Sequence, residues 1–145
     1  MKWSGGPGIL AGVVVGGAIG AAARHGIFMV AGDRTILALL LVNLSGALLL
    51  GFLVGRLDPS GPTEQDAEVE VIRIPSLWRD HRLLTAVLGV GGLGAFTTYS
   101  GFVLEIVRLA QQESWVGAGA LLLACLASGP LAVAVGLRWG SSRRD

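Results

Sequence analysis

The stretch GVGGLGAFTTYSGF, residues 89–102, decides the fold, because it places a helix-breaking pattern inside one of the most apolar regions of the chain. Four glycines precede two threonines, a tyrosine and a serine. Glycine weakens a helix, and hydroxyl side chains offer hydrogen bonds that can replace those of the backbone. The stretch therefore predicts a helix that is broken at 94–98.

The composition indicates that lipid is the main solvent of this chain. Of its 145 residues, 52% are hydrophobic and 14% are charged, whereas a soluble domain carries about 25% charged residues. The net charge of +1 argues against a nucleic-acid-binding surface. The single cysteine, Cys125, leaves no disulfide framework and no zinc set, and we expect it to be a small core residue.

Four hydrophobic runs predict an all-α membrane protein, a single four-helix transmembrane domain over residues 1–145. Each run reaches the roughly 20 residues that a helix needs to cross a bilayer. The runs lie at about 7–30, 35–55, 83–110 and 115–138. Tryptophans fall at their ends, where indoles prefer the headgroup level: Trp3, Trp78, Trp115 and Trp139. An alternative for the first run is a secretory signal with a cleavage site at 21–23.

The connections predict which ends of the helices share a side of the membrane. The loops after the first and third helices are short, and residues 56–82 form a flexible or weakly structured polar loop, with 76–82 as an interfacial lead-in. Of the 11 basic residues, eight lie on the side of the termini and long loop, and three, Arg24, Arg34 and Arg108, lie on the other. The positive-inside rule therefore places both termini in the cytoplasm.

The first helix carries a strip of small residues and an arginine inside the span. Glycine recurs at every fourth position from Gly8 to Gly20, through Gly12 and Gly16, which predicts close packing against another helix. Arg24 follows inside the span, where a guanidinium is either functional and paired or snorkels to the interface. His25 is expected to be interfacial rather than a metal ligand.

The second and third helices carry the polar groups that need partners. Asn43 lies at mid-span, so its amide must bond either across a helix interface or to a permeating species, and both alternatives stay open. Residues 89, 91 and 94 spell the dinucleotide-binding G-x-G-x-x-G, which we discount because it requires a preceding strand. A helix broken in the membrane is tolerated only when it is buried or lines a cavity, and its exposed carbonyls, amides and hydroxyls can meet ions. We therefore interpret 94–98 as an ion site.

Three segments of the first three predicted helices form a set: GGAIGAAARH at 16–25, LVNLSGALLLG at 41–51 and GLGAFTTYSGFVLE at 92–105. In their order and helix placement, they resemble the signatures of the Fluc (CrcB) fluoride channels. The resemblance implies an antiparallel dimer of four-helix subunits, two narrow fluoride pathways, and a structural sodium ion (Na+) at the interface. It implies a protein of the inner or plasma membrane that exports fluoride and so lowers its toxicity.

The resemblance also assigns roles along the fluoride pathway. Asn43 would be the pore amide, Ser100 would belong to a polar track, and Tyr99 and Phe102 would occupy the two aromatic-box positions. Such donors can replace the hydration of a small anion without a fixed charge that traps it, and aromatic edges carry partial positive charge. Without the surrounding motif, ordinary helix packing would explain the two aromatic rings.

Further positions follow from the same resemblance. The backbone carbonyls of Gly94 and Thr97 would bind the sodium ion, and Arg24 would lie in an aqueous vestibule. Glu105 matches the family's acidic residue, and Arg108, three residues on, is placed to pair with it.

Two features depart from the family pattern. Tyr99 and Gly101 stand where the family has phenylalanine and threonine, and the fourth helix offers only Cys125 and Ser128 as polar candidates, so we assign none of them there. The excess of basic residues on one side also favours a single orientation in the membrane, whereas the chain of an antiparallel homodimer must insert both ways and so needs nearly equal positive charge on its two sides. These features lead to the hypothesis that the chain pairs with a related chain of opposite topology.

Two rival functions remain at this stage. A small four-helix drug or cation exporter would need a carboxylate in the membrane, and the first helix has no Asp or Glu. A non-transporting membrane assembly subunit would use Asn43 and the helix break for packing alone. Enzyme function is not expected, because no nucleophile and base occur together near the spans.

Overall fold

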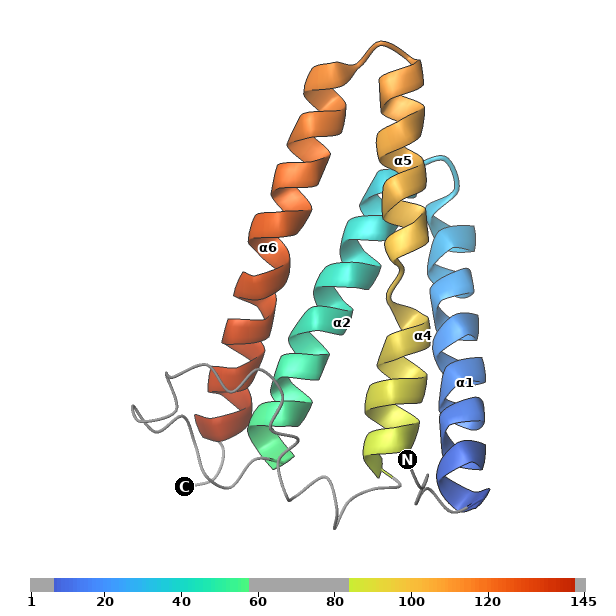
Figure 1. Ribbon diagram of the computed structural model, residues 1–145, viewed down its shortest axis with the longest axis vertical. Helices are drawn as coiled ribbons and strands as arrows, with labels where there is room; N and C mark the ends of the chain where they lie inside the picture. Colours follow the sequence, from blue (N-terminus) through green and yellow to red (C-terminus); the bar gives the residue numbers. More distant parts are fainter. Residues whose placement is uncertain (1–6, 58–83, 143–145) are drawn as a thin grey trace, which may run out of the picture.

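The computed structural model describes residues 7–57 and 84–142. Their helices are α1 (Pro7–Ala31), α2 (Thr35–Leu57), η3 (Thr85–Leu93), α4 (Gly94–Phe96), α5 (Tyr99–Gln111) and α6 (Trp115–Ser141). Because η3, α4 and α5 follow one path, they form the third of four spans that are long and apolar enough to cross a membrane (Figure 1). The predicted class, an all-α protein of four membrane-spanning helices with the third one broken, is confirmed.

The short predicted loops are also confirmed. α1 and α2 are joined by a three-residue turn, in which Gly32 has a φ of 55° that glycine adopts without strain. Residues 112–114 join α5 to α6 at the same end of the molecule (Figure 1). Of the predicted interfacial tryptophans, Trp115 and Trp139 lie near the two ends of α6 and are exposed. Trp3, Trp78 and the predicted loop from residue 58 onward lie outside the described residues.

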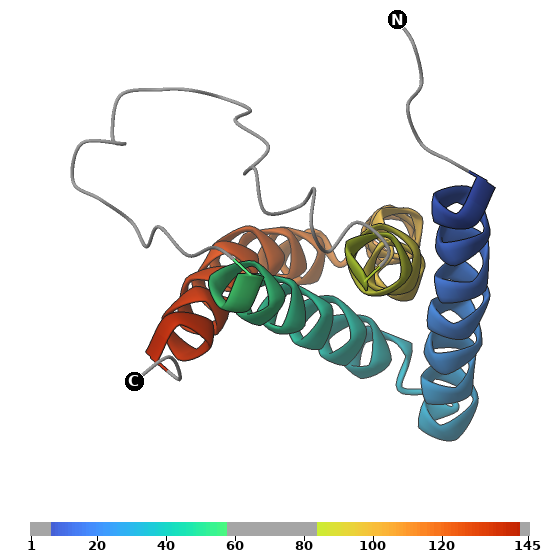
Figure 2. The same ribbon diagram turned by 90° about the horizontal axis from the view of Figure 1, so that it is seen from below.

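The glycine strip of α1 forms the predicted close contact, against η3 and α4 (Figure 2). Three of its members are buried: Gly12, Gly16 and Gly20. A Cβ atom at Gly16 would lie 2.0 Å from the carbonyl oxygen of Val87, so a larger residue would separate the helices. The prediction was wrong for Gly8, because no described atom lies within 4 Å of where its Cβ would be. The strip is therefore one step shorter than the spacing suggested.

A second close contact joins α2 to α6, and the sequence analysis did not predict it. Two glycines four residues apart on each helix face one another: Gly51 and Gly55, Gly136 and Gly140. A Cβ atom at any of them would lie 2.2–2.4 Å from a backbone carbonyl oxygen of the facing helix. Figure 2 shows the resulting division, with α2 beside α6 and the first half of the third span beside α1.

The third span changes its winding before it breaks. η3 is a π-helix, and the amide of Gly94 donates to the carbonyl of Gly89 five residues earlier. Wider turns of this kind occur frequently at functional sites. The glycines that spell the dinucleotide fingerprint thus lie in a helix, without the strand and turn that such a fingerprint requires.

Candidate functional site

The break itself consists of two residues with extended backbones. Thr97 has φ −74° and ψ 158°, and Thr98 has φ −145° and ψ 123°. α4 ends just before them, and α5 begins directly after them at Tyr99. The Oγ1 of Thr98 accepts a hydrogen bond of 3.2 Å from the amide of Gly101, which is the usual arrangement of a threonine N-cap. The predicted interruption at 94–98 is confirmed and is confined to Thr97 and Thr98.

Asn43 of α2 clamps the second of these residues. Its Nδ2 donates to the carbonyl oxygen of Thr98 at 3.0 Å, and its Oδ1 accepts from the amide of Thr98 at 2.8 Å. A mid-membrane backbone group that has left its helix must find another partner, and Asn43 provides two. Of the two alternatives for this amide, the structure therefore shows the bond across a helix interface.

Arg24 approaches the break from α1, the helix that packs on η3 and α4, whereas Asn43 comes from α2, which packs on α6. Its Nη1 donates to the carbonyl oxygen of Thr97 at 3.4 Å, which is a long hydrogen bond. The guanidinium lies two turns before the end of α1. The contact favours the paired interpretation of Arg24 over snorkelling to the interface.

The carbonyls before the break differ in how they are satisfied. Leu93 accepts from both the amide and the Oγ1 of Thr97, at 3.0 Å each. The amide of Thr98, which would bond to the carbonyl of Gly94 in a continuous helix, is instead held by Asn43. The carbonyl of Gly94 therefore lacks its usual helical donor. Carbonyl oxygens of an unwound helix are suitable ligands for a hard cation.

Two recesses flank the break, and the predicted site residues divide between them. One has a volume of about 330 Å³ and is lined by seven residues: Asn43, Thr97, Thr98, Tyr99, Phe102, Cys125 and Leu126. The other has a volume of about 490 Å³, and its polar lining comes from Arg24, His25, Thr98 and Ser100. Ser100 thus lies with Arg24, on the opposite side of the break from the other three predicted pathway residues, and its Oγ is 3.3 Å from the Oγ1 of Thr98.

The two predicted aromatic-box residues have different surroundings. Their ring centroids lie 6.1 Å apart with a tilt of 48°. Phe102 is buried and packs on Leu39 and Leu121, whereas Tyr99 is 78% exposed. Within one chain, therefore, Phe102 is a packing residue that borders the recess, and Tyr99 projects from the surface.

Glu105 and Arg108 form the ion pair that their spacing predicted. The Nη1 of Arg108 donates to the Oε1 of Glu105 at 2.7 Å. Glu105 is buried while the side chain of Arg108 is half-exposed, so a partly solvated guanidinium neutralises a buried carboxylate.

Sequence reasoning missed Gly46, and it expected Cys125 to be a small core residue without assigning it a role in the pathway. A Cβ atom at Gly46 would lie 2.3 Å from the Cγ2 of Thr97, so the first residue of the break rests on this glycine. The sequence did offer one indication of this contact, because Gly46 lies three residues after Asn43 and therefore on the same face of the helix. Cys125 is only partly buried, packs against the cluster that contains Phe102, and also lines the smaller recess.

Four membrane-spanning helices, with one broken at mid-span and flanked by two recesses that contain polar side chains, define a small multi-pass membrane protein. The family model described as "CrcB-like protein, Camphor Resistance (CrcB)" matches residues 11–137. The chain belongs to the CrcB family.

Similar proteins cover nearly the whole chain. A fluoride-specific ion channel FluC 2 of Symbiobacterium thermophilum is 36% identical over 133 residues, 89% of this chain and 94% of the relative. FluC of Sphingopyxis alaskensis is 35% identical over 86% of this chain and 89% of its own length. FluC 2 of Natronomonas pharaonis is 32% identical over 90% of this chain and 92% of its own length. No solved structure matches the chain significantly.

Proposed function

We propose that this chain is the subunit of a fluoride-specific channel that lets fluoride leave the cytoplasm and so lowers its toxicity. The observation that carries the proposal is the break at Thr97 and Thr98, which Asn43 holds in the middle of a membrane span. The relatives named above as fluoride-specific ion channels support the choice of ion.

The groups around the break suit a small, strongly hydrated anion. α5 begins at Tyr99, so the first backbone amides of a helix of 13 residues point toward the break, together with the hydroxyl of Ser100. Asn43 uses one of its two Nδ2 hydrogens on Thr98, which leaves the other for an anion. Tyr99 and Phe102 border the same recess as Asn43, where ring edges can face the ion. Arg24, on the other side of the break, would draw anions into a vestibule.

The carbonyls of Gly94 and Thr97 are the proposed sodium ligands. Two observations support this proposal: the carbonyl of Gly94 lacks its helical donor, and the carbonyl of Thr97 makes only a long hydrogen bond to Arg24, which leaves it a second lone pair. A bound sodium ion would supply the charge that ties together two broken helices at a dimer interface. The ion would need further oxygens, which a second subunit would contribute.

The partner that we propose is a chain of opposite orientation. Tyr99 is exposed although it lies at mid-membrane, and large apolar residues are exposed along all four spans. An antiparallel partner would cover part of this surface and complete each pathway. The charge bias toward one side favours a related chain over an identical one, and the numbered names of several relatives, FluC 1 and FluC 2, are consistent with this choice. Both termini would then be cytoplasmic in this chain.

The proposal is tested by fluoride efflux from liposomes that hold this chain, alone and together with a related chain from the same genome. We expect fluoride efflux without chloride efflux, and full activity only with the related chain. Full activity of the chain alone would refute obligate pairing, and no fluoride efflux under either condition would refute the channel. Cells that lack the gene should become sensitive to fluoride, which neither a drug exporter nor an assembly subunit predicts.

A further inference from the structure

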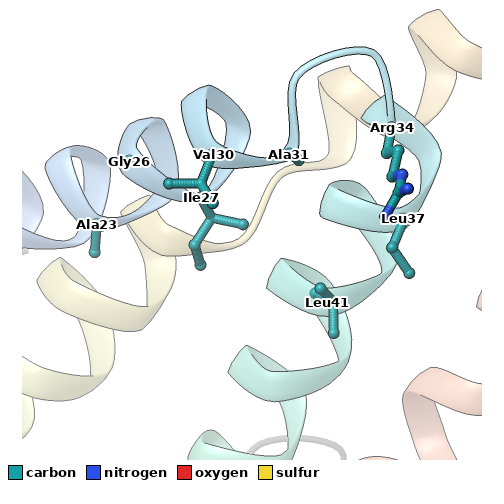
Figure 3. A pocket seen from close by; sticks show the side chains of 8 residues that line it. All are labelled: Ala23, Gly26, Ile27, Val30, Ala31, Arg34, Leu37 and Leu41. Carbon is teal, nitrogen blue, oxygen red and sulfur yellow. The ribbon is translucent and has the colours of Figure 1, made fainter.

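An apolar groove opens where α1 and α2 diverge from their connecting turn. Its volume is about 580 Å³, and eight residues line it: Ala23, Gly26, Ile27, Val30, Ala31, Arg34, Leu37 and Leu41 (Figure 3). The groove exists because α1 packs mainly on η3 and α4 while α2 packs mainly on α6, so the two helices touch little beyond their turn. Val30 is 92% exposed on one wall, and Leu41 is half-exposed on the other.

Arg34 is the one ionisable side chain of this lining. It follows Asp33 in the turn, yet no described carboxylate lies within ion-pair distance of its guanidinium. Figure 3 shows its side chain extending along the start of α2 toward Leu37, with Ile27 and Val30 across the groove on α1. A cation that has no ion-pair partner among the described residues therefore lies over the mouth of an apolar groove.

The depth of these groups in the membrane matches the layout of a phospholipid. The spans end at Ala31 and begin again at Thr35, so Arg34 lies at the headgroup level. Leu41 lies seven residues further along α2, about 10 Å deeper at 1.5 Å per residue. The groove thus runs from a cationic headgroup position into the hydrocarbon region.

We propose that this groove binds one anionic phospholipid, with its phosphate at Arg34 and an acyl chain between Ile27, Leu37 and Leu41. Charge complementarity favours this occupant over a second copy of the chain, because Glu105 is the one acidic residue within the described spans and it is buried and paired with Arg108. An arginine near an anionic lipid surface gives a roughly five-fold preference for the anionic headgroup. The site does not depend on which ion the protein conducts.

The test is native mass spectrometry of the full chain, delipidated in detergent and titrated with phosphatidylglycerol or with phosphatidylcholine of the same acyl chains. We expect one retained lipid per chain and about five-fold tighter retention of phosphatidylglycerol. Arg34→Gln should abolish the preference but keep weak binding of both lipids. Arg138→Gln, at the last turn of α6, is the matched control and should change nothing.

A second pair of variants tests the acyl part of the site. No described atom lies within 4 Å of a Cβ placed at Gly26 or at Gly119 of α6, so both positions accept leucine without a backbone clash. Gly26→Leu should obstruct the acyl-chain path and weaken the retention of both lipids, whereas Gly119→Leu should bind as the wild type does. Equal retention of the two lipids by the wild type, or an unchanged preference in Arg34→Gln, would overturn the proposal. A shift in the monomer–dimer distribution by Gly26→Leu with lipid binding intact would overturn it in favour of a second copy.

Discussion

Replacement of Asn43 by leucine should release the break in the third span. Leucine has the same number and branching of side-chain heavy atoms and suits α2, but it offers no hydrogen-bonding group to the backbone of Thr98. The variant loses two hydrogen bonds, of 3.0 Å to the carbonyl and 2.8 Å from the amide. Thr98 would then have to find water or re-form helical bonds, and either outcome changes the geometry of both flanking recesses.

The magnitude follows from those two bonds. A buried backbone group left without a partner costs about 1–3 kcal/mol, whereas hydrogen bonds between membrane helices average about 0.6 kcal/mol. For the two bonds together, the membrane average gives about 1 kcal/mol and the buried-group cost about 2–6 kcal/mol. Because Asn43 is only half-buried, we expect a loss toward the lower end, roughly 1–3 kcal/mol. If the loss falls on local opening, the exchange protection of the Thr98 amide should fall about five-fold or more, since 1.4 kcal/mol is a factor of ten.

Hydrogen exchange of the purified protein measures this directly, and liposome efflux reports its consequence for transport. Ser45→Ala is the matched control, because Ser45 lies on the same helix and bonds only to carbonyls one turn back, those of Leu41 and Val42. We expect fast exchange and a large loss of fluoride efflux for Asn43→Leu, with neither change for the control. Unaltered exchange of the Thr98 amide in Asn43→Leu would refute the assignment of Asn43 as the clamp of the break.

Three further substitutions probe the supports of the site. Gly20→Val should prevent α1 from packing, because its Cβ would lie 2.1 Å from a carbonyl oxygen of the third span, and the yield of folded protein should collapse while Gly8→Val stays normal. Thr98→Val removes the N-cap of α5 and should lower the free energy of unfolding by about 1 kcal/mol, measured by thermal unfolding in detergent. Arg108→Gln removes the ion pair with Glu105. Because the side chain of Arg108 is half-exposed, the free energy of unfolding should fall by about 1 kcal/mol. That loss should disappear when Glu105→Gln is added.

The fold could be predicted from the sequence because its signals are local and physical. Run length predicts the spans, and the glycine-then-hydroxyl pattern of 89–102 predicts the break. The α2–α6 contact was missed because each of the two helices carries only one pair of glycines four residues apart, and the spacing of a pair does not identify the helix that packs against it. The π-helix was missed because a helix of wider turns has no distinct composition.

The site was predicted less completely, and for a different reason. Sequence order places Tyr99 and Ser100 side by side, yet the restart of the helix at Tyr99 turns them toward different recesses. The alternatives for Asn43 and Arg24 depended on long-range partners, the carbonyls of Thr98 and Thr97, which no spacing rule identifies. Residue type thus indicated which side chains needed a partner, and only the packed helices determined which partner they met.

The two helix pairs explain why the break lies where it does. The glycine contact with α1 holds η3, and the α2–α6 contact presents Asn43 from the other pair. The hydrogen bonds of the break divide between the pairs: Thr97 accepts from Arg24 of the first pair, and Thr98 bonds to Asn43 of the second. The break therefore occurs where the third span passes from one pair to the other. A break at this point needs little rigidity of its own, because each side is fixed by a separate close-packed contact. Loosening either contact should therefore disturb the site even when the substituted residue does not line it. Gly51→Val on α2 should impair fluoride efflux, although Gly51 faces α6 and lines neither recess.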